Sequence, residues 1–290
     1  MKYALFLGCV IPTEQYQYEL SFRAVAPHLG IEVVDIEGYS CCGVPLKGYN
    51  VVGWLYLAAR NIALAENLGL NILTLCNGCY NSFIEAKHYL DTRDEVRAKV
   101  NESLAIEGLE YKGIIKIVHI LEALRDNVDL EKLKTELKYP LDGFKVAPHY
   151  GCHALRPSDL IEYVNSEDPQ IMDEIIKSLG ATCEYYPEKL DCCGSTITAA
   201  DYEASFKLTG AKIEALQKRN YDALVTVCPF CQKMYDGKQE AVKRVTEDKN
   251  PLLPVFYLTQ LIGVALGLDS ESLGLNFNAT PVDEFVERLN

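Results

Sequence analysis

Cysteine is the residue type in this sequence whose number and spacing could do chemistry. Ten of the eleven cysteines fall into two sets with the same order: a lone cysteine, an adjacent pair before a glycine, and a C-x-x-C motif. The sets are Cys9, Cys41, Cys42, Cys76 and Cys79, and then Cys152, Cys192, Cys193, Cys228 and Cys231. Adjacent cysteines form a disulfide with each other only under strain. Two neighbouring thiolates can, however, reach two atoms of one metal cluster.

The number of thiols in each set bears on the kind of metal site. A structural zinc site takes four ligands, and a cubane 4Fe–4S cluster takes four cysteines. Five thiols that include an adjacent pair favour an iron–sulfur cluster of less usual shape, in which one thiolate bridges two irons. Gly43 and Gly194 follow the pairs, and we expect them where the backbone passes close to sulfur and iron or makes a strained turn. Either C-x-x-C motif alone would fit a zinc clip or a thioredoxin-like dithiol about equally well.

Strand and helix patterns place these cysteines at one edge of a sheet. In the first half, apolar strand-like runs alternate with helical stretches, in the order 3–7, 14–28, 31–36, 52–68 and 71–75. This alternation predicts a parallel sheet with helices on its faces, and the ligands of such sheets gather at the carboxyl ends of the strands. Cys9 and Cys76 each follow a predicted strand, so we expect the five thiols of one half to converge.

The second half repeats the pattern of the first. Its predicted elements are a strand at 144–150, a helix at 169–179, a helix at 202–219 and a strand at 223–227. The gaps between lone cysteine, pair and C-x-x-C motif are 31 and 33 residues in the first half, and 39 and 34 residues in the second. A repeat of this length indicates a duplicated domain. We therefore predict an α/β fold of two homologous Rossmann-like parallel-sheet domains with additional helices, at residues 1–140 and 141–290.

Two further segments have helical or apolar patterns. Residues 82–138 are predicted to be mostly helical, with their most apolar part at 114–124. Residues 254–268 are expected to form a buried helix, with an interfacial helix as the alternative. No segment approaches the ~20 apolar residues of a membrane span. The apolar run at the N-terminus is too short for a secretion signal and is expected to be the first strand.

Composition narrows the class of protein. The chain has 290 residues and a net charge of −13, which argues against nucleic acid as a partner because phosphate binding requires a basic surface. The cytoplasm is the expected location, and cysteines there indicate metal or redox chemistry rather than structural disulfides. Neither half has the C-x-x-C-x-x-C-x-x-x-C-P run of a bacterial ferredoxin, so we expect electrons to arrive from a partner.

Five other residues could have a role near the cysteines or in the core. His153 follows the lone cysteine of the second set and is a candidate proton donor to a departing thiolate, although a hydrogen-bonded loop histidine would fit as well. Lys47 and Arg156 could meet anionic groups of a substrate or could be ordinary surface charges. Cys183 lies outside the repeated pattern and is expected to be a buried, inert thiol. His119 lies in an apolar segment and is expected to pack in the core.

The two cysteine sets and their glycines resemble the twin cysteine-rich CCG domains of the heterodisulfide reductase B-subunit. The resemblance covers nearly the whole chain. Related domains occur in iron–sulfur subunits of glycolate and lactate oxidation, and in some succinate dehydrogenase and thiol:fumarate reductase complexes. The heterodisulfide reductase B-subunit is favoured because both copies keep all five cysteines and because the chain consists of the two domains alone.

The resemblance implies a specific site and activity. Each domain would hold a noncubane 4Fe–4S cluster through its five cysteines. The mixed disulfide of coenzyme M and coenzyme B would bind between the two clusters, and its S–S bond would be cleaved reductively to two thiols. Electrons would come through the ferredoxin-like C-subunit of heterodisulfide reductase, which is supplied by the flavin-containing A-subunit.

Two alternatives stay open on the sequence. The chain could be an iron–sulfur subunit of a lactate/glycolate or succinate/fumarate oxidoreductase, in which the domains pass electrons to a membrane carrier. It could also be a zinc-stabilised scaffold without turnover, because zinc binds the same thiolate ligands.

Overall fold

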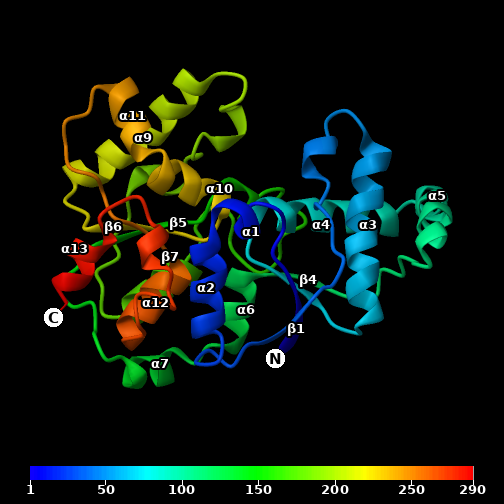
Figure 1. Ribbon diagram of the computed structural model, residues 1–290, viewed down its shortest axis with the longest axis horizontal. Coiled ribbons are helices and arrows are strands. Elements are labelled where there is room, and N and C mark those ends of the chain that lie inside the picture. Colours follow the sequence, from blue (N-terminus) through cyan, green and yellow to red (C-terminus); the bar gives the residue numbers. More distant parts are fainter. Residues whose placement is uncertain (290) are drawn as a thin grey trace.

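The computed structural model describes residues 1–289 and contains two parallel β-sheets (Figure 1). The first sheet has the strand order β2-β1-β3-β4, and the second has the order β5-β6-β7. All neighbouring strands run parallel, so each connection is a crossover that carries helices onto a face of the sheet. The α/β fold of two parallel-sheet units that the sequence predicts is confirmed.

The strands are short and, apart from β2, almost entirely buried. They are β1 (Lys2–Phe6), β2 (Glu32–Asp35), β3 (Ile72–Thr74), β4 (Ile117–His119), β5 (Val146–His149), β6 (Ala223–Thr226) and β7 (Val255–Tyr257). The helices of the first half are α1 (Ile11–Glu14), α2 (Tyr16–Val25), α3 (Val51–Asn67), α4 (Asn77–Asp91), α5 (Asp94–Leu104), α6 (Ile120–Asn127) and α7 (Leu130–Glu136). Those of the second half are α8 (Ile171–Ser178), α9 (Tyr202–Lys218), α10 (Pro229–Gln232), α11 (Gln239–Thr246), α12 (Leu258–Leu266) and α13 (Val282–Glu287). A π-helical turn, Lys233–Gly237, continues α10.

Three of the predicted helical segments need correction. Residues 114–124 supply β4 before α6, and residues 254–268 supply β7 before α12. Both strands have three residues, and an apolar run this short does not distinguish a strand from a buried helix. The helix predicted at 14–28 is divided into α1 and α2, because Gln15 between them leaves the helical conformation, with φ −136°.

In the second sheet, the segment that corresponds to β2 lies beside β5 but does not form a regular strand. Thr182 lies beside β5: its backbone N–H donates to Phe144 O at 2.8 Å, and the Val146 N–H donates to Thr182 O at 2.9 Å. These contacts amount to an isolated bridge between Lys145 and Thr182. The segment that matches β2 in the repeat is therefore positioned alike in both halves but is regular only in the first.

Helices α3 and α9 follow the two Cys-Cys-Gly loops and have the same length of 17 residues. The Asn50 side chain accepts a hydrogen bond from Gly53 N at the start of α3, and the Asp201 side chain accepts one from Ala204 N at the start of α9, both at 2.9 Å. Such caps satisfy amide groups that a helix leaves unpaired at its N-terminus. The same local signal thus starts the same helix in both halves.

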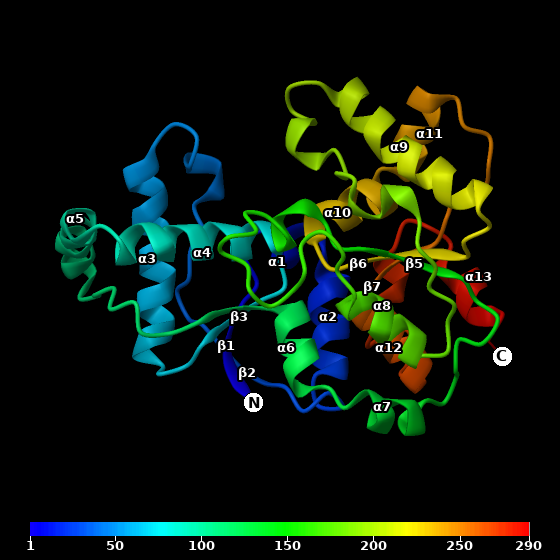
Figure 2. The same cartoon turned by 180° about the vertical axis from the view of Figure 1, so that it is seen from behind.

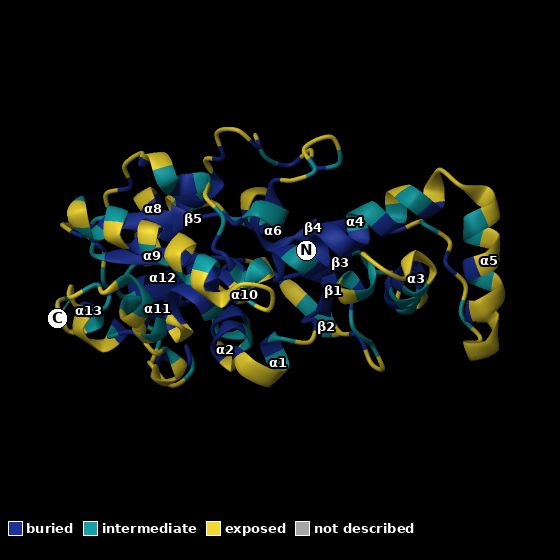
Figure 3. Cartoon of the chain, turned by 90° about the horizontal axis from the view of Figure 1, so that it is seen from above, coloured by how far each residue is buried: buried dark blue, intermediate teal, exposed yellow. Residues whose placement is uncertain are grey.

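Helices of the first half pack against helices of the second, and α7 with α8 is one such pair. Helix α2 packs against α12, and α6 packs against α8; Figure 2 shows these helices grouped in the lower middle of the view. Tyr18 of α2 stacks on Tyr257 at a centroid distance of 3.8 Å, and its hydroxyl donates to Val227 O at 3.0 Å. The largest group of buried apolar residues includes members from both halves, and Figure 3 shows the strands and α12 buried while outer helices such as α5 are largely exposed. The strand ends of the two sheets are therefore fixed relative to each other.

A membrane-spanning helix is absent from the described part of the chain. Within residues 1–289, none of the helices is both long enough and apolar enough to cross a bilayer.

Candidate metal centre

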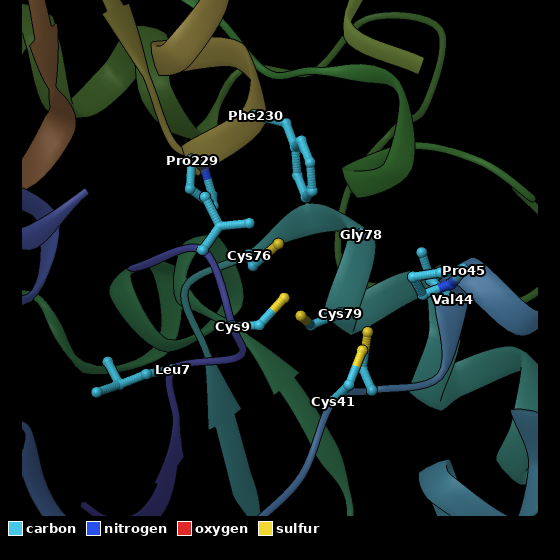
Figure 4. A pocket seen from close by; sticks show the side chains of 12 residues that line it. Leu7, Cys9, Cys41, Val44, Pro45, Cys76, Gly78, Cys79, Pro229 and Phe230 are labelled. Atoms are coloured by element: carbon cyan, nitrogen blue, oxygen red, sulfur yellow. The ribbon is translucent and has the colours of Figure 1, made fainter. Parts of the chain in front are cut away.

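Ten cysteine thiols lie in one continuous series through the middle of the molecule, each near enough to the next to shift its pKa. We call the five of the first half the first thiol site; its series runs Cys9, Cys41, Cys42, Cys79, Cys76. The second thiol site has the matching order Cys152, Cys192, Cys193, Cys231, Cys228. Cys228 raises the pKa of Cys76, and Cys76 lowers the pKa of Cys228, so the two sites adjoin. Figure 4 shows sulfur atoms of the first site turned toward a shared space.

Strand ends and helix starts hold these thiols. Cys76 and Cys228 directly precede α4 and α10, just beyond β3 and β6, and the lone cysteines Cys9 and Cys152 follow β1 and β5. These positions are the carboxyl ends of parallel strands, where ligands are expected. Cys9 is exposed, whereas Cys76 and Cys228 are 2% and 5% exposed. The five thiols of the first half line one pocket, and this site reaches the surface at Cys9.

Crowding changes the acidity of the thiols. Hydrogen bonds from Cys42 and Cys9 lower the pKa of Cys41 to about 2. Hydrogen bonds from Cys152, and then from Cys193, lower the pKa of Cys192 to about 2. The neighbouring thiols donate to Cys41 and Cys192, so their own pKa values are raised. Burial raises these pKa values further. Five thiolates in one site therefore require a cation that takes the place of the thiol protons.

Gly43 and Gly194 both lie in the left-handed backbone region, with φ of 85° and 86°. A Cβ on Gly43 would lie 2.9 Å from Trp54 O, and a Cβ on Gly194 would lie 2.5 Å from Ser205 O. The predicted strained turn is confirmed. The close neighbour, however, is the backbone of the following helix, α3 or α9, and not sulfur, because each loop turns directly onto that helix.

Gly8 and Gly151, which sequence analysis did not single out, are the glycines that face sulfur. A Cβ on Gly8 would lie 2.8 Å from Cys79 Sγ. A Cβ on Gly151 would lie 2.6 Å from Asn77 Nδ2 and 3.2 Å from Cys231 Sγ. Their signal is visible in the sequence, since a glycine precedes the lone cysteine in both halves. The missing side chain leaves room for the sulfur atoms of the C-x-x-C motif.

Each half also contributes residues to the thiol site of the other. Pro229 and Phe230, from the second C-x-x-C motif, line the pocket at the first site (Figure 4). Asn77, from the first motif, donates from Nδ2 to Tyr150 O at 2.7 Å, just before the second lone cysteine. Gly78 has the position in its motif that Phe230 has in the other. Sequence analysis missed these residues because they act across the two halves.

The polar residues suggested by the sequence have different surroundings. His153 is half-buried, and its Nδ1 has no hydrogen-bond partner within residues 1–289. Lys47 forms an ion pair with Glu85 at 2.5 Å, and Arg156 forms one with Glu167 at 3.2 Å. Carboxylates of the chain itself therefore already neutralise both cations.

Cys183 and His119 are buried as expected. Burial, and then the charge of Asp173, raises the pKa of Cys183 to about 12, and its Sγ donates to Asp173 Oδ1 at 3.6 Å. Nε2 of His119 lies 2.9 Å from Asn77 Oδ1, and burial lowers the His119 pKa to about 3. His119 is thus a neutral core residue that positions Asn77 between the two halves.

Comparison with known proteins identifies the family. A model of the CCG cysteine-rich domain matches residues 3–84 and 146–236, the two ranges that contain the cysteine sets. A protein of Archaeoglobus profundus, named as similar to the heterodisulfide reductase B-subunit, is 40% identical over 298 residues, which cover 100% of this chain and 98% of that protein. The chain belongs to the CCG-domain family of the heterodisulfide reductase B-subunit.

Other members of this family carry more than one functional name. The B-subunit of the ferredoxin/F420H2-dependent CoB–CoM heterodisulfide reductase of Methanosarcina acetivorans is 36% identical over 99% of this chain and 97% of its own length. The 8-methylmenaquinol:fumarate reductase membrane anchor subunit of Wolinella succinogenes is also 36% identical, over 96% of each chain. A crystal structure of a hypothetical protein from Helicobacter pylori has the same fold, with a TM-score of 0.76 over 96% of this chain at 18% identity; this chain spans 51% of that one.

Replacing Gly194 by alanine should destabilise the second thiol site. We expect the free energy of unfolding to fall by about 2 kcal/mol or more, because an L-residue in the left-handed region costs ~1–2 kcal/mol and the new Cβ would strike Ser205 O. Chemical denaturation without oxygen measures the change. Gly237→Ala is the matched control, since no atom lies within 4 Å of a Cβ there; equal stability of the two variants would contradict the strained-turn account.

Proposed function

We propose that this chain is the catalytic subunit of a heterodisulfide reductase and cleaves the mixed disulfide of coenzyme M and coenzyme B. The reaction is R–S–S–R′ + 2e⁻ + 2H⁺ → RSH + R′SH. The observation that carries the proposal is the contact between Cys76 and Cys228, because it brings two equivalent thiol sites together in one chain. Two adjacent redox sites suit a substrate with two bonded sulfur atoms. The names of two close relatives agree with this assignment.

The cofactors we propose are two noncubane 4Fe–4S clusters, one in each thiol site. Each half offers five thiols in a coupled series, with Gly8 or Gly151 leaving space beside a sulfur. This donor set would fit a group with several irons held by thiolate ligands. The proposed ligands are Cys9, Cys41, Cys42, Cys76, Cys79, Cys152, Cys192, Cys193, Cys228 and Cys231.

Bound clusters would supply electrons one at a time. Residues of the chain would cover the site, donate protons and hold the two motifs in place. Phe230 and Pro229 would cover the first site and limit the entry of water. His153 would protonate a departing thiolate near the second site, since its buried Nδ1 has no other partner within residues 1–289. Asn77, held by His119, would keep the two C-x-x-C motifs in register across the halves.

The electrons would come from other subunits of the complex. We propose the ferredoxin-like C-subunit as the direct donor and the flavin-containing A-subunit as its source. We also propose that the duplicated units meet at residues 140 and 141. In support, the backbone N–H of Leu141 donates to Leu179 O of the second half at 2.8 Å.

A second candidate function is electron transfer in a quinol:fumarate reductase. The fumarate reductase relative of Wolinella succinogenes matches this chain as closely as the Methanosarcina protein does. In that role the thiol sites would pass electrons between a quinol and other subunits, and no disulfide would be cleaved.

A disulfide-cleavage assay separates the two functions. The full chain, purified without oxygen and loaded with iron, should oxidise reduced viologen dye when the coenzyme M–coenzyme B disulfide is added. Two thiols should appear for each disulfide consumed. Inactivity toward this disulfide in iron-loaded protein, together with oxidation of an added menaquinol by the complex, would favour the second candidate.

Substitution of Cys193 by serine should empty the second thiol site. We expect a loss of about half of the iron and acid-labile sulfide, because hard serine oxygen is a poor replacement for a bridging or terminal thiolate. Cys42→Ser should do the same to the first site. Cys183→Ser is the control, since its thiol contacts Asp173 and lies outside the ten-thiol series. Full iron in Cys193→Ser and Cys42→Ser would refute the five-ligand assignment.

A further inference from the structure

The two thiol sites are lined differently behind the cysteines, although the backbone is repeated. Phe6 and His149 are the last residues of β1 and β5. Phe83 and Tyr235 each stand four residues after the last cysteine of a C-x-x-C motif. The ring pairs have similar geometry: Phe6 meets Phe83 edge-on at 4.7 Å, and His149 meets Tyr235 edge-on at 4.9 Å. The first site thus has two apolar rings where the second has two rings with polar atoms.

A third matched position carries the largest difference. Asn61 and Lys212 are the eleventh residues of the equal-length helices α3 and α9. Asn61 Nδ2 donates to Ser40 O at 3.3 Å, and Lys212 Nζ donates to Asp191 O at 3.0 Å. Ser40 and Asp191 are the residues just before the two cysteine pairs. The two side chains therefore hold the same carbonyl, but one is neutral and the other is a cation.

The Lys212 cation has no carboxylate partner in the described part of the chain. It is 1% exposed, and its Nζ bonds to His149 Nδ1 at 2.8 Å and to the Lys189 and Asp191 carbonyl oxygens. The other buried lysine behaves differently: Lys189 forms an ion pair with Asp173 at 2.8 Å.

The charges that Lys212 faces are mainly those of the second thiol site. Burial lowers the pKa of Lys212 to about 8, while Cys231, Asp191 and the Cys192–Cys193 pair raise it. Burial, and then the charge of Lys212, holds the pKa of His149 well below its usual range, so His149 is the neutral acceptor of this bond. The positive charge of the trio therefore sits on Lys212.

We propose that Lys212 gives the second thiol site a buried positive charge that the first site lacks, and that this makes a redox group held there the stronger electron acceptor of the two. A nearby fixed cation stabilises the reduced state, which is the more negative one, and net charge is among the factors that set iron–sulfur potentials. Electrons from the donor subunit would then collect at the second site. The inference rests on the proposed function, because it requires a redox group in each thiol site.

Two buried polar atoms near the second thiol site would also favour a higher redox potential there. Nε2 of His149 and the hydroxyl of Tyr235 are buried and have no hydrogen-bond partner within residues 1–289. Their counterparts, Phe6 and Phe83, have no such atoms. Hydrogen bonds from these groups toward the sulfur-rich side would add to the effect of Lys212, since such bonds also tune cluster potentials. Lys212 would therefore act through the redox group at the second site and would not itself contact the substrate.

Redox titration of the full chain, purified without oxygen and followed by electron paramagnetic resonance, tests the proposal. Wild-type protein should show two distinct potentials. The Lys212→Asn variant has at this position the side chain that the first half uses. In this variant the potential of the second site should fall by at least about 59 mV. For one electron, that shift changes the distribution between the two sites about tenfold. Lys212→Met should shift the same potential in the same direction, and Asn61→Lys should raise the other one.

Controls separate this inference from the iron–sulfur proposal. Lys207→Met removes an exposed lysine of α9 that pairs with Glu203, and it should leave both potentials unchanged. Iron and sulfide content is measured on every variant. Wild-type protein without iron would contradict the proposed function itself. If Lys212→Asn and Asn61→Lys bind the full amount of iron and both keep the wild-type potentials, the proposed role of Lys212 is wrong. A purely structural role of Lys212 predicts that result.

Discussion

The thiols of Cys76 and Cys228 adjoin where both are almost fully buried, and their proximity constrains how the two halves pack. Each of these cysteines lies between the end of a strand and the start of a helix, so the carboxyl ends of β3 and β6 have to face each other. The pairs α2–α12 and α6–α8 hold the sheets in that orientation. The two thiol sites therefore lie next to each other between the two sheets.

Duplication repeats the scaffold of this centre but not its electrostatics. The features that fix the backbone recur, namely the helix caps Asn50 and Asp201 and the glycine after each cysteine pair. The residues behind the thiols differ, with Asn61 in the first half and Lys212 in the second. A common frame can therefore hold equal ligand sets while each side has its own charge. Under the proposed function, such a difference would make the two sides accept electrons with different ease.

The sequence predicts the parts of this arrangement that depend on local pattern. Strand ends followed by Gly-Cys, repeated cysteine pairs and alternating elements are visible without coordinates, and the two-sheet fold follows from them. The three-residue strands β4 and β7 could not be predicted, because pairing with β3 and β6 and not their own sequence makes them strands. The cross-half contacts of Phe230 and Asn77 join residues separated by much of the chain. The burial of Lys212 also depends on tertiary packing, since a lysine on a charged helix is ordinarily exposed.

Anomalous diffraction at the iron edge, from crystals grown without oxygen, tests the two-cluster centre most directly. We predict two separate multi-iron peaks, one at each thiol site, with all five cysteines of a half within bonding distance of its irons. The two peaks should be adjacent, on either side of Cys76 and Cys228. A single ion in each half bound by four thiols, with zinc rather than iron as the scatterer, would contradict this arrangement.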